Sequence, residues 1–146
     1  MRDTLVQRLV FRAAVLLTLG LATGVLVSAA MTGKIPADPH AMLASHLNAL
    51  LGAFWMIAVA WTLPMTHFGA VGRERLVLGV TVANYANWLV TAVKSFLKVS
   101  GVDFIGEPKN DLIFGLLTLL VVLPSFAVAG AWAFGLRGRG GDAETP

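Results

Sequence analysis

The chain has 146 residues, of which 57% are hydrophobic and 13% are charged, with a formal net charge of +3. So apolar a composition excludes an ordinary soluble domain and predicts one integral membrane domain. There is no cysteine, which excludes disulfides, thiolate catalysis and any metal or haem held by cysteine. The basic residues form no cluster interleaved with aromatic residues, so we expect no nucleic-acid partner.

Four apolar stretches are long enough to cross a bilayer. They cover residues 9–31, 42–63, 76–99 and 112–136. Short connections between them favour an up-down bundle. The predicted fold class is therefore an all-α integral membrane protein, a four-transmembrane-helix up-down bundle that forms a single domain over residues 1–136. Residues 137–146 are rich in glycine and charge, and we expect them to be a disordered cytoplasmic tail.

Basic residues near the span ends indicate the orientation of the chain in the membrane. Seven are expected on one side, namely Arg2, Arg8, Arg12, Arg73, Arg75, Arg137 and Arg139, and four on the other, namely Lys34, Lys94, Lys98 and Lys109. This difference predicts that both termini are cytoplasmic.

The first span contains a row of small residues, Gly20, Gly24 and Ser28, which would let another helix approach closely. His46 lies about one turn inside the second span and is the one histidine expected within the membrane. An intramembrane ionisable residue is a functional hypothesis by default. The structural alternative is a histidine that hydrogen-bonds a neighbouring helix. A haem held by His46 alone would keep an open sixth position, which suits substrate binding better than electron transfer.

The residues around His46 indicate what a ligand would meet on the second span. Ala49 and Ala53 share its helix face and are small, so a flat ligand could lie against them. Asn48 is about 200° away around the helix. His46 and Asn48 therefore cannot share one small site within the chain.

The third span carries a polar stripe, made of Thr81, Asn84, Asn87, Thr91 and Ser95. The spacing places these side chains on one face of a helix. Each would cost several kcal/mol, or roughly 2–7, if it faced hydrocarbon. The stripe must therefore face protein, a cofactor or a cavity. Helix-to-helix hydrogen bonding alone is the structural alternative.

The end of the third span and the fourth span carry fewer signals. Lys94 adjoins the polar stripe and either extends to water or binds an anionic group such as a propionate. Asn110 or Asp111 is expected to cap the fourth helix, and Pro124 predicts a kink within it. No carboxylate lies within a span, so the sequence does not support paired-carboxylate acid–base chemistry.

A histidine at a set distance before an apolar run carries a resemblance to a known family. The run Ala44-Ser45-His46 is followed, after ten residues, by IAVAWTLP at residues 57–64, and then by Phe68-Gly69, Arg75 and Gly79. In this register the chain resembles bacterial styrene oxide isomerase. The four-span length and the connections agree with that family over most of the chain.

The resemblance implies a homotrimer in the bacterial inner membrane that binds ferric haem b at its subunit interfaces, with His46 as the axial metal ligand. It also implies an isomerase that converts a hydrophobic epoxide from the bilayer to an aldehyde or ketone. In this Meinwald rearrangement the ferric iron acts as a Lewis acid on the epoxide oxygen, with no net oxidation or reduction. The expected partners are thus a small hydrophobic epoxide, membrane lipid and further copies of the chain.

The third span departs from the family pattern. The family's carboxylate position falls on Ala83 or Asn84, and its tyrosine position falls on Thr91 or Ala92. Its second-span asparagine falls on Gly52, close to Asn48 in sequence. The candidate catalytic residues are Asn84, Asn87, Tyr85 and Thr91, of which Asn87 matches a family asparagine. The candidate cofactor-binding residues are His46, Asn48, Ala49, Ala53 and Lys94.

Two other functions stay open from the sequence. The first is a non-enzymatic haem-b protein that senses gas or redox state through His46. The second is a structural membrane protein without a cofactor, whose polar stripe makes interhelical hydrogen bonds.

Overall fold

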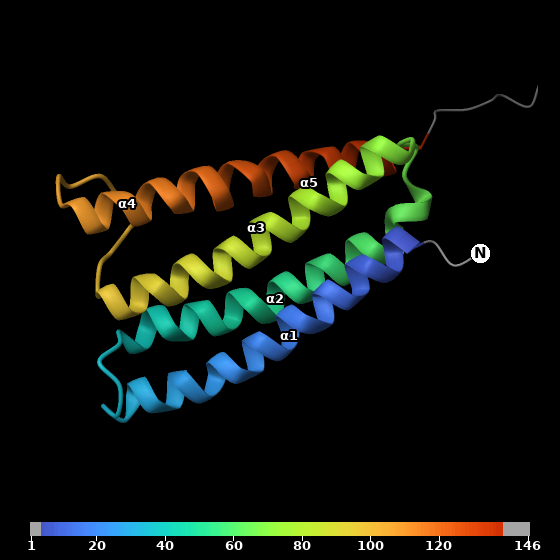
Figure 1. The fold of residues 1–146 in the computed structure, drawn as a ribbon. Coiled ribbons are helices and arrows are strands. Elements are labelled where there is room, and N and C mark those ends of the chain that lie inside the picture. Colours follow the sequence, from blue (N-terminus) through green and yellow to red (C-terminus); the bar gives the residue numbers. More distant parts are fainter. Residues whose placement is uncertain (1–3, 139–146) are drawn as a thin grey trace, which may run out of the picture.

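The structure is a computed structural model that describes residues 4–138. Its elements in chain order are α1 (Thr4–Met31), α2 (Pro39–Thr62), the 3-10 turn η1 (Leu63–Met65), α3 (Ala70–Leu97), α4 (Pro108–Leu117), the π-helical turn η2 (Thr118–Val122) and α5 (Leu123–Leu136). The described residues contain no strand. Consecutive long helices run in opposite directions, with the start of α1 and the end of α5 at the same end of the molecule (Figure 1).

Four helical segments are long and apolar enough to cross a membrane. They are Thr4–Met31, Pro39–Met65, Ala70–Leu97 and Pro108–Leu136. The predicted class, an all-α membrane protein with four spans, is therefore confirmed. Every helix begins earlier than its predicted span, because helices continue past the apolar run into polar turns that water can solvate. Most of the predicted tail lies outside the described residues.

The starts of α2 and α4 are set by acidic caps and prolines. The Asp38 carboxylate accepts a hydrogen bond from the Ala41 backbone N–H at 2.7 Å, and Pro39 opens α2. The expectation that Asn110 or Asp111 caps the fourth span is wrong. Glu107 is the cap, because Pro108 starts the helix sooner and a proline at the first position sacrifices no hydrogen bond.

Asn110 has a different role in the connection before the fourth span. Its side chain is buried, accepts from the Gly101 N–H at 2.6 Å and donates to the Asp103 carbonyl at 2.8 Å. Asp111 accepts from the Ile105 N–H at 3.0 Å. These side chains thus hold the turn together instead of capping the helix.

The fourth span is irregular where the sequence predicts a kink. In η2 the Leu123 N–H bonds to the Thr118 carbonyl, five residues back, immediately before Pro124. A proline has no N–H to donate and its ring clashes with the preceding turn. A π-helical turn absorbs this disruption, and such turns are frequent at functional sites.

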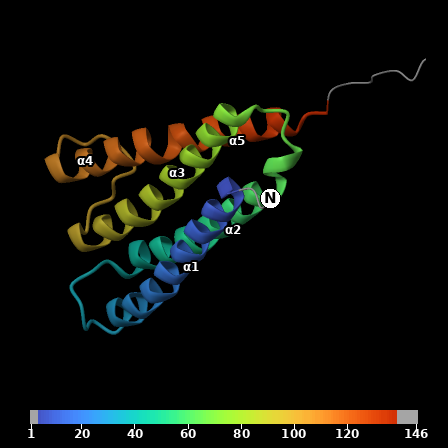
Figure 2. The ribbon, with the colours of Figure 1, turned by 45° about the vertical axis from the view of Figure 1, so that its right-hand side comes forward.

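The helices pack mainly in sequence order. The contact between α1 and α2 is the most extensive, α2 packs on α3, and the fourth span packs chiefly along α3. Figure 2 shows α3 between α2 and the fourth span. Only 17% of the apolar window of the fourth span is buried. Most of its surface is therefore available to lipid or to another protein chain.

Candidate functional site

His46 is held by the backbone of α1. Its Nδ1 atom lies 2.7 Å from the Gly20 carbonyl oxygen. A carbonyl oxygen can only accept, so Nδ1 carries the proton and Nε2 keeps its lone pair. No described residue bonds to Nε2. This is the tautomer in which a histidine ligates a metal through Nε2 while its other nitrogen is fixed by a carbonyl.

The imidazole of His46 lies directly over Gly24. A Cβ atom added at Gly24 would stand 3.1 Å from Cε1 and 3.3 Å from Nδ1 of His46. One Cβ added at Gly20 would stand 2.8 Å from the Ala49 Cβ. The prediction that these glycines allow a close helix approach is confirmed. Gly24 also provides the space for the ring, which the small-residue row alone did not reveal.

Ala49 and Ala53 do not form an open surface beside His46. Both side chains are 0% exposed and belong to the hydrophobic core. The reason is that α1 covers this face of α2, as the contact between Gly20 and Ala49 shows. Neither alanine can therefore lie against a ligand, which corrects the expectation for these two residues.

On the opposite side of α2, Asn48 contacts Asn87 of α3, and these two residues are called the amide pair. The Asn48 Nδ2 donates to the Asn87 Oδ1 at 3.0 Å and to the Thr91 Oγ1 at 3.3 Å. The Thr91 hydroxyl in turn donates to the Asn87 Oδ1 at 3.5 Å. Two predicted catalytic residues, Asn87 and Thr91, are thus brought together with Asn48, which was predicted for cofactor binding.

The other members of the polar stripe form hydrogen bonds with other groups. The Thr81 hydroxyl donates to the Val77 carbonyl at 2.7 Å, and the Ser95 hydroxyl donates to the Asp38 carbonyl at 2.8 Å. The Asn84 amide donates to the Val80 carbonyl at 2.7 Å, and its oxygen lies against Gly52. The sequence allowed the stripe to face protein, a cofactor or a cavity, and the structure shows contacts with other segments of the protein for Asn84, Asn87, Thr91 and Ser95. Asn84 is a buried packing residue, 5% exposed, and it is not part of the amide pair.

Tyr85 faces α1 and not the amide pair. Its hydroxyl donates to the Arg12 carbonyl at 2.8 Å. On the same side, the Trp88 indole N–H donates to the Thr23 hydroxyl at 3.0 Å. The structure therefore does not bring Tyr85 together with Asn87 and Thr91.

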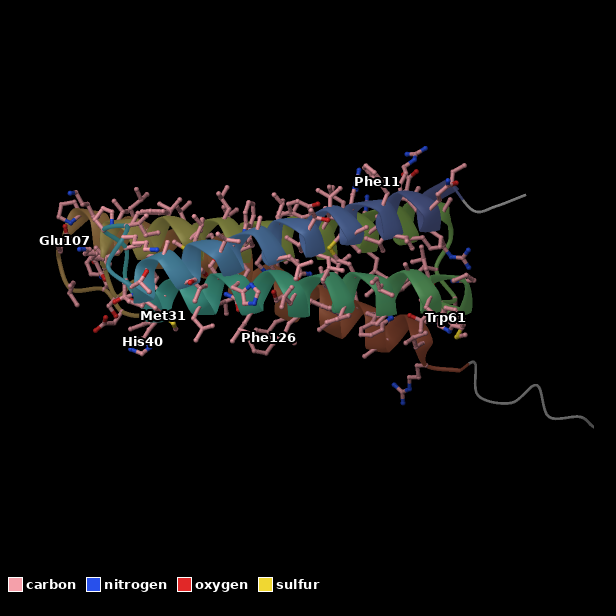
Figure 3. The ribbon with its side chains drawn as sticks, turned by 90° about the horizontal axis from the view of Figure 1, so that it is seen from below. Phe11, Met31, His40, Trp61, Glu107 and Phe126 are labelled. Carbon is pink, nitrogen blue, oxygen red and sulfur yellow. The ribbon has the colours of Figure 1, made fainter. Side chains whose placement is uncertain are left out.

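Lys94 lines a cavity at the end of the molecule that holds the α1–α2 connection. The cavity has a volume of about 330 Å³ and is also lined by Asp38, His40 and Ser100. His40 lies at the same end as Met31 and Glu107 (Figure 3). Apolar side chains, those of Ala41, Ala44 and Val99, line the rest of the cavity. The predicted role of Lys94 toward an anionic group stays a prediction.

The two polar centres lie on different sides of α2. His46 contacts α1, whereas Asn48 contacts α3. The sequence-based prediction that they cannot share one site within the chain is confirmed. Among the described residues, no group of three or more His, Cys, Asp or Glu side chains could hold a bare metal ion.

Comparisons with known proteins identify the family. The family model described as styrene oxide isomerase matches residues 5–138. The chain is 30% identical over 97 residues to hydroxylaminobenzene mutase HabB of Ectopseudomonas oleovorans, and the alignment covers 66% of this chain and 56% of that protein. The chain thus spans little more than half of that relative, and no solved structure matches it. The match over residues 5–138 shows that the chain belongs to the styrene oxide isomerase family.

Proposed function

We propose that the protein is a membrane isomerase that uses ferric haem b to convert a small hydrophobic epoxide to an aldehyde or ketone. The observation that carries this proposal is the arrangement of His46. Its ring lies over Gly24, its Nδ1–H is bonded to the Gly20 carbonyl, and its Nε2 has no partner among the described residues.

The residues around His46 fit a haem. A porphyrin would supply four ligands itself, so the single side chain of His46 could hold it, whereas a bare ion would need several side chains. The bond from Nδ1 to Gly20 holds the ring and increases the basicity of Nε2 as a ligand. When bound, ferric haem would supply a Lewis acid that polarises the substrate oxygen without net redox change.

Further copies of the chain would complete the site. Within one chain, His46 and the amide pair lie on different sides of α2. Both are only partly exposed in the isolated chain. We propose a homotrimer with haem at its interfaces, in which His46 of one copy meets Asn48 and Asn87 of another.

Mixed oligomers test this arrangement. The variants His46→Ala and Asn87→Leu are expected to be inactive separately. When the two variants are co-expressed, some interfaces would pair the intact His46 of the Asn87→Leu copy with the intact Asn87 of the His46→Ala copy. Activity should therefore return. If the mixture stays as inactive as the separate variants while mixed oligomers are isolated, each site lies within one chain.

The proposed location is the bacterial inner membrane with both termini in the cytoplasm. The basic-residue asymmetry supports this orientation, and Arg73 and Arg75 lie on the first turns of α3, at the end of the molecule where α1 begins. A reporter that is active only in the cytoplasm, fused after residue 146, should be active. An inactive reporter would indicate the opposite orientation, with the C-terminus outside the cytoplasm.

A second candidate reaction is favoured by the relative HabB, a mutase named for hydroxylaminobenzene. An arylhydroxylamine carries its oxygen on the nitrogen that is attached to the aromatic ring. An aryl epoxide carries its oxygen on the carbon that is attached to the ring. A Lewis acid could polarise either one. We therefore propose arylhydroxylamines as the second substrate class to test.

The first experiment is an absorption spectrum of detergent-purified protein, followed by epoxide addition to the ferric sample. The wild type should show a Soret band and form a carbonyl product, whereas His46→Ala should lose both. His67→Ala is the matched control, because His67 lies in the connection after α2. A Soret band without turnover of either substrate class would favour a sensor. Absence of the band after expression with haem supplied would refute the haem proposal.

A further inference from the structure

We propose that the groove between the start of α3 and the end of α5 binds one acyl chain of an anionic phospholipid, with Arg75 holding the lipid phosphate. The inference goes beyond the proposed function, because it concerns neither His46 nor the reaction. Phe68, Arg75 and Gly79 carry part of the family resemblance in the sequence, and the proposed site gives none of them a role.

The groove is a cavity of about 290 Å³ at the end of the molecule where α1 begins. Its lining includes Phe68, Arg75, Leu76, Ala127, Val128 and Ala131. Figure 1 shows the start of α3 and the end of α5 side by side. Leu76 and Val128 are buried and form the floor, whereas Ala127 and Ala131 are exposed. The groove therefore opens to the outside of the helix bundle.

Packing contacts close the groove at both ends. At one end the Phe68 ring covers Gly135, where an added Cβ would stand 2.5 Å from Cε2 of the ring. The His67 backbone N–H donates to the Gly135 carbonyl at 3.0 Å, which holds the connection before α3 against α5. At the other end, a Cβ added at Gly79 would stand 2.6 Å from Cγ2 of Val128. The groove is thus a bounded site whose shape is set by the fold.

Arg75 supplies the charge of the groove. Among the described residues that line the groove it is the one charged side chain, and it forms no hydrogen bond or ion pair with any described residue. The neighbouring carboxylate of Glu74 lines a different cavity, together with Thr4 of α1. A guanidinium presents its N–H donors in a planar fork that matches a phosphate. An unpaired cation beside an apolar channel therefore suits an anionic amphiphile.

The position of Arg75 along α3 places it near the lipid phosphates. With 28 residues, α3 is about 42 Å long, whereas the hydrocarbon layer is about 30 Å thick. A helix centred in the bilayer therefore extends about 6 Å beyond the hydrocarbon at each end. Arg75 lies about 7.5 Å along the helix from Ala70, and helical side chains point back toward the helix start. Its guanidinium thus reaches the headgroup layer.

The apolar part of the groove lies deeper in the membrane than Arg75. Ala127 is nine residues before Leu136, where α5 ends, so it lies about 13.5 Å inside that end of the helix. The groove therefore leads from the headgroup layer into the hydrocarbon, in the direction of an acyl chain. Its volume is near the lower limit of about 300 Å³ for small-molecule pockets. It can hold the upper part of one acyl chain.

The charges favour an anionic phospholipid over a zwitterionic one. The phosphate of either lipid could accept from Arg75. The ammonium group of a phosphatidylethanolamine would add a second positive charge there, and no carboxylate is among the described residues that line the groove. A phosphatidylglycerol adds no such charge. Basic pockets between membrane helices on the cytoplasmic side are typical sites for anionic headgroups, and the asymmetry of basic residues predicts that this end is cytoplasmic.

Native mass spectrometry of the detergent-purified full chain, expressed with haem supplied, tests the headgroup contact. Dioleoyl-phosphatidylglycerol should bind to the wild type at least about fivefold more tightly than dioleoyl-phosphatidylethanolamine. Arg75→Gln should lose about this factor, whereas Arg75→Lys should retain most of the binding because it keeps the charge. Arg8→Gln is the matched control, because Arg8 is exposed on α1 at the same end of the molecule. Equal affinity for the two lipids, or an equal loss in Arg8→Gln, would overturn the proposal.

A second pair of variants tests the groove itself. Ala131→Leu would fill the groove, whereas Ala133→Leu adds the same side chain at an exposed position of α5 outside its lining. Ala131→Leu should weaken phosphatidylglycerol binding at least about fivefold relative to Ala133→Leu, with the same number of copies in the assembly. Unchanged lipid binding would overturn the proposal. So would a changed number of copies, which would indicate that another copy covers the groove. These measurements do not require bound haem or turnover, so the proposed function can fail or stand independently.

Discussion

Replacement of Gly24 by alanine tests whether the glycine cradle positions His46 as a ligand. The added methyl group would stand 3.1 Å from the His46 Cε1, closer than ordinary van der Waals contact. The ring must therefore shift by a few tenths of an ångström, away from its 2.7 Å bond to Gly20. Complete loss of such an orienting bond costs roughly 10–100-fold in metal affinity, or about 1.4–2.7 kcal/mol, so the lower end of this range is the upper limit for the small shift in Gly24→Ala.

The assay is a titration of haem-free protein with ferric haem, followed at the Soret band, together with thermal unfolding. Gly24→Ala should bind haem more weakly by up to about tenfold, and Gly24→Leu, whose larger side chain would displace the ring further, should bind more weakly still. Gly130→Ala is the matched control, because its Cβ meets nothing within 4 Å. That variant should bind haem normally and gain about 0.5–1 kcal/mol of stability from lower chain entropy. Wild-type haem affinity in Gly24→Leu would refute the reasoning.

Two further predictions concern the packing of α2 and α1 against α3. Gly52→Ala would place a Cβ 2.6 Å from the Asn84 oxygen, so the free energy of unfolding should fall by about 1–3 kcal/mol; an unchanged melting temperature would contradict the close contact. Thr23→Val removes the acceptor of the Trp88 indole N–H and should cost about 1 kcal/mol. Trp88→Phe should cost less in that background than in the wild type, because the hydrogen bond is already absent there, and full additivity in chemical denaturation would show that the bond contributes nothing.

The membrane class, the four spans and the singular position of His46 could be predicted from sequence, because each is a local property. The length of an apolar run decides whether a helix can cross hydrocarbon. The regular rotation of an α-helix likewise predicted that His46 and Asn48 diverge, and the contacts of His46 with α1 and of Asn48 with α3 confirm it. Neither conclusion depends on which helices are neighbours.

The caps and the polar stripe show where local patterns are insufficient. Several acidic and amide residues precede the fourth span, and only the backbone geometry selects Glu107 over Asn110. The stripe was predicted as one face, but a helix face meets more than one neighbour. Asn87 and Thr91 bond to Asn48 of α2, whereas Asn84 bonds within α3.

The sequence by itself determined that this chain has four spans long enough to cross a membrane, with His46 inside one of them. The tertiary structure alone decided which atom of that histidine is available, because the Gly20 carbonyl fixes Nδ1 as the donor. It also decided that Ala49 and Ala53 are covered and that Asn48 of α2 bonds to Asn87 of α3. Sequence periodicity fixes the direction in which a side chain leaves its helix, whereas its partners depend on how neighbouring helices pack.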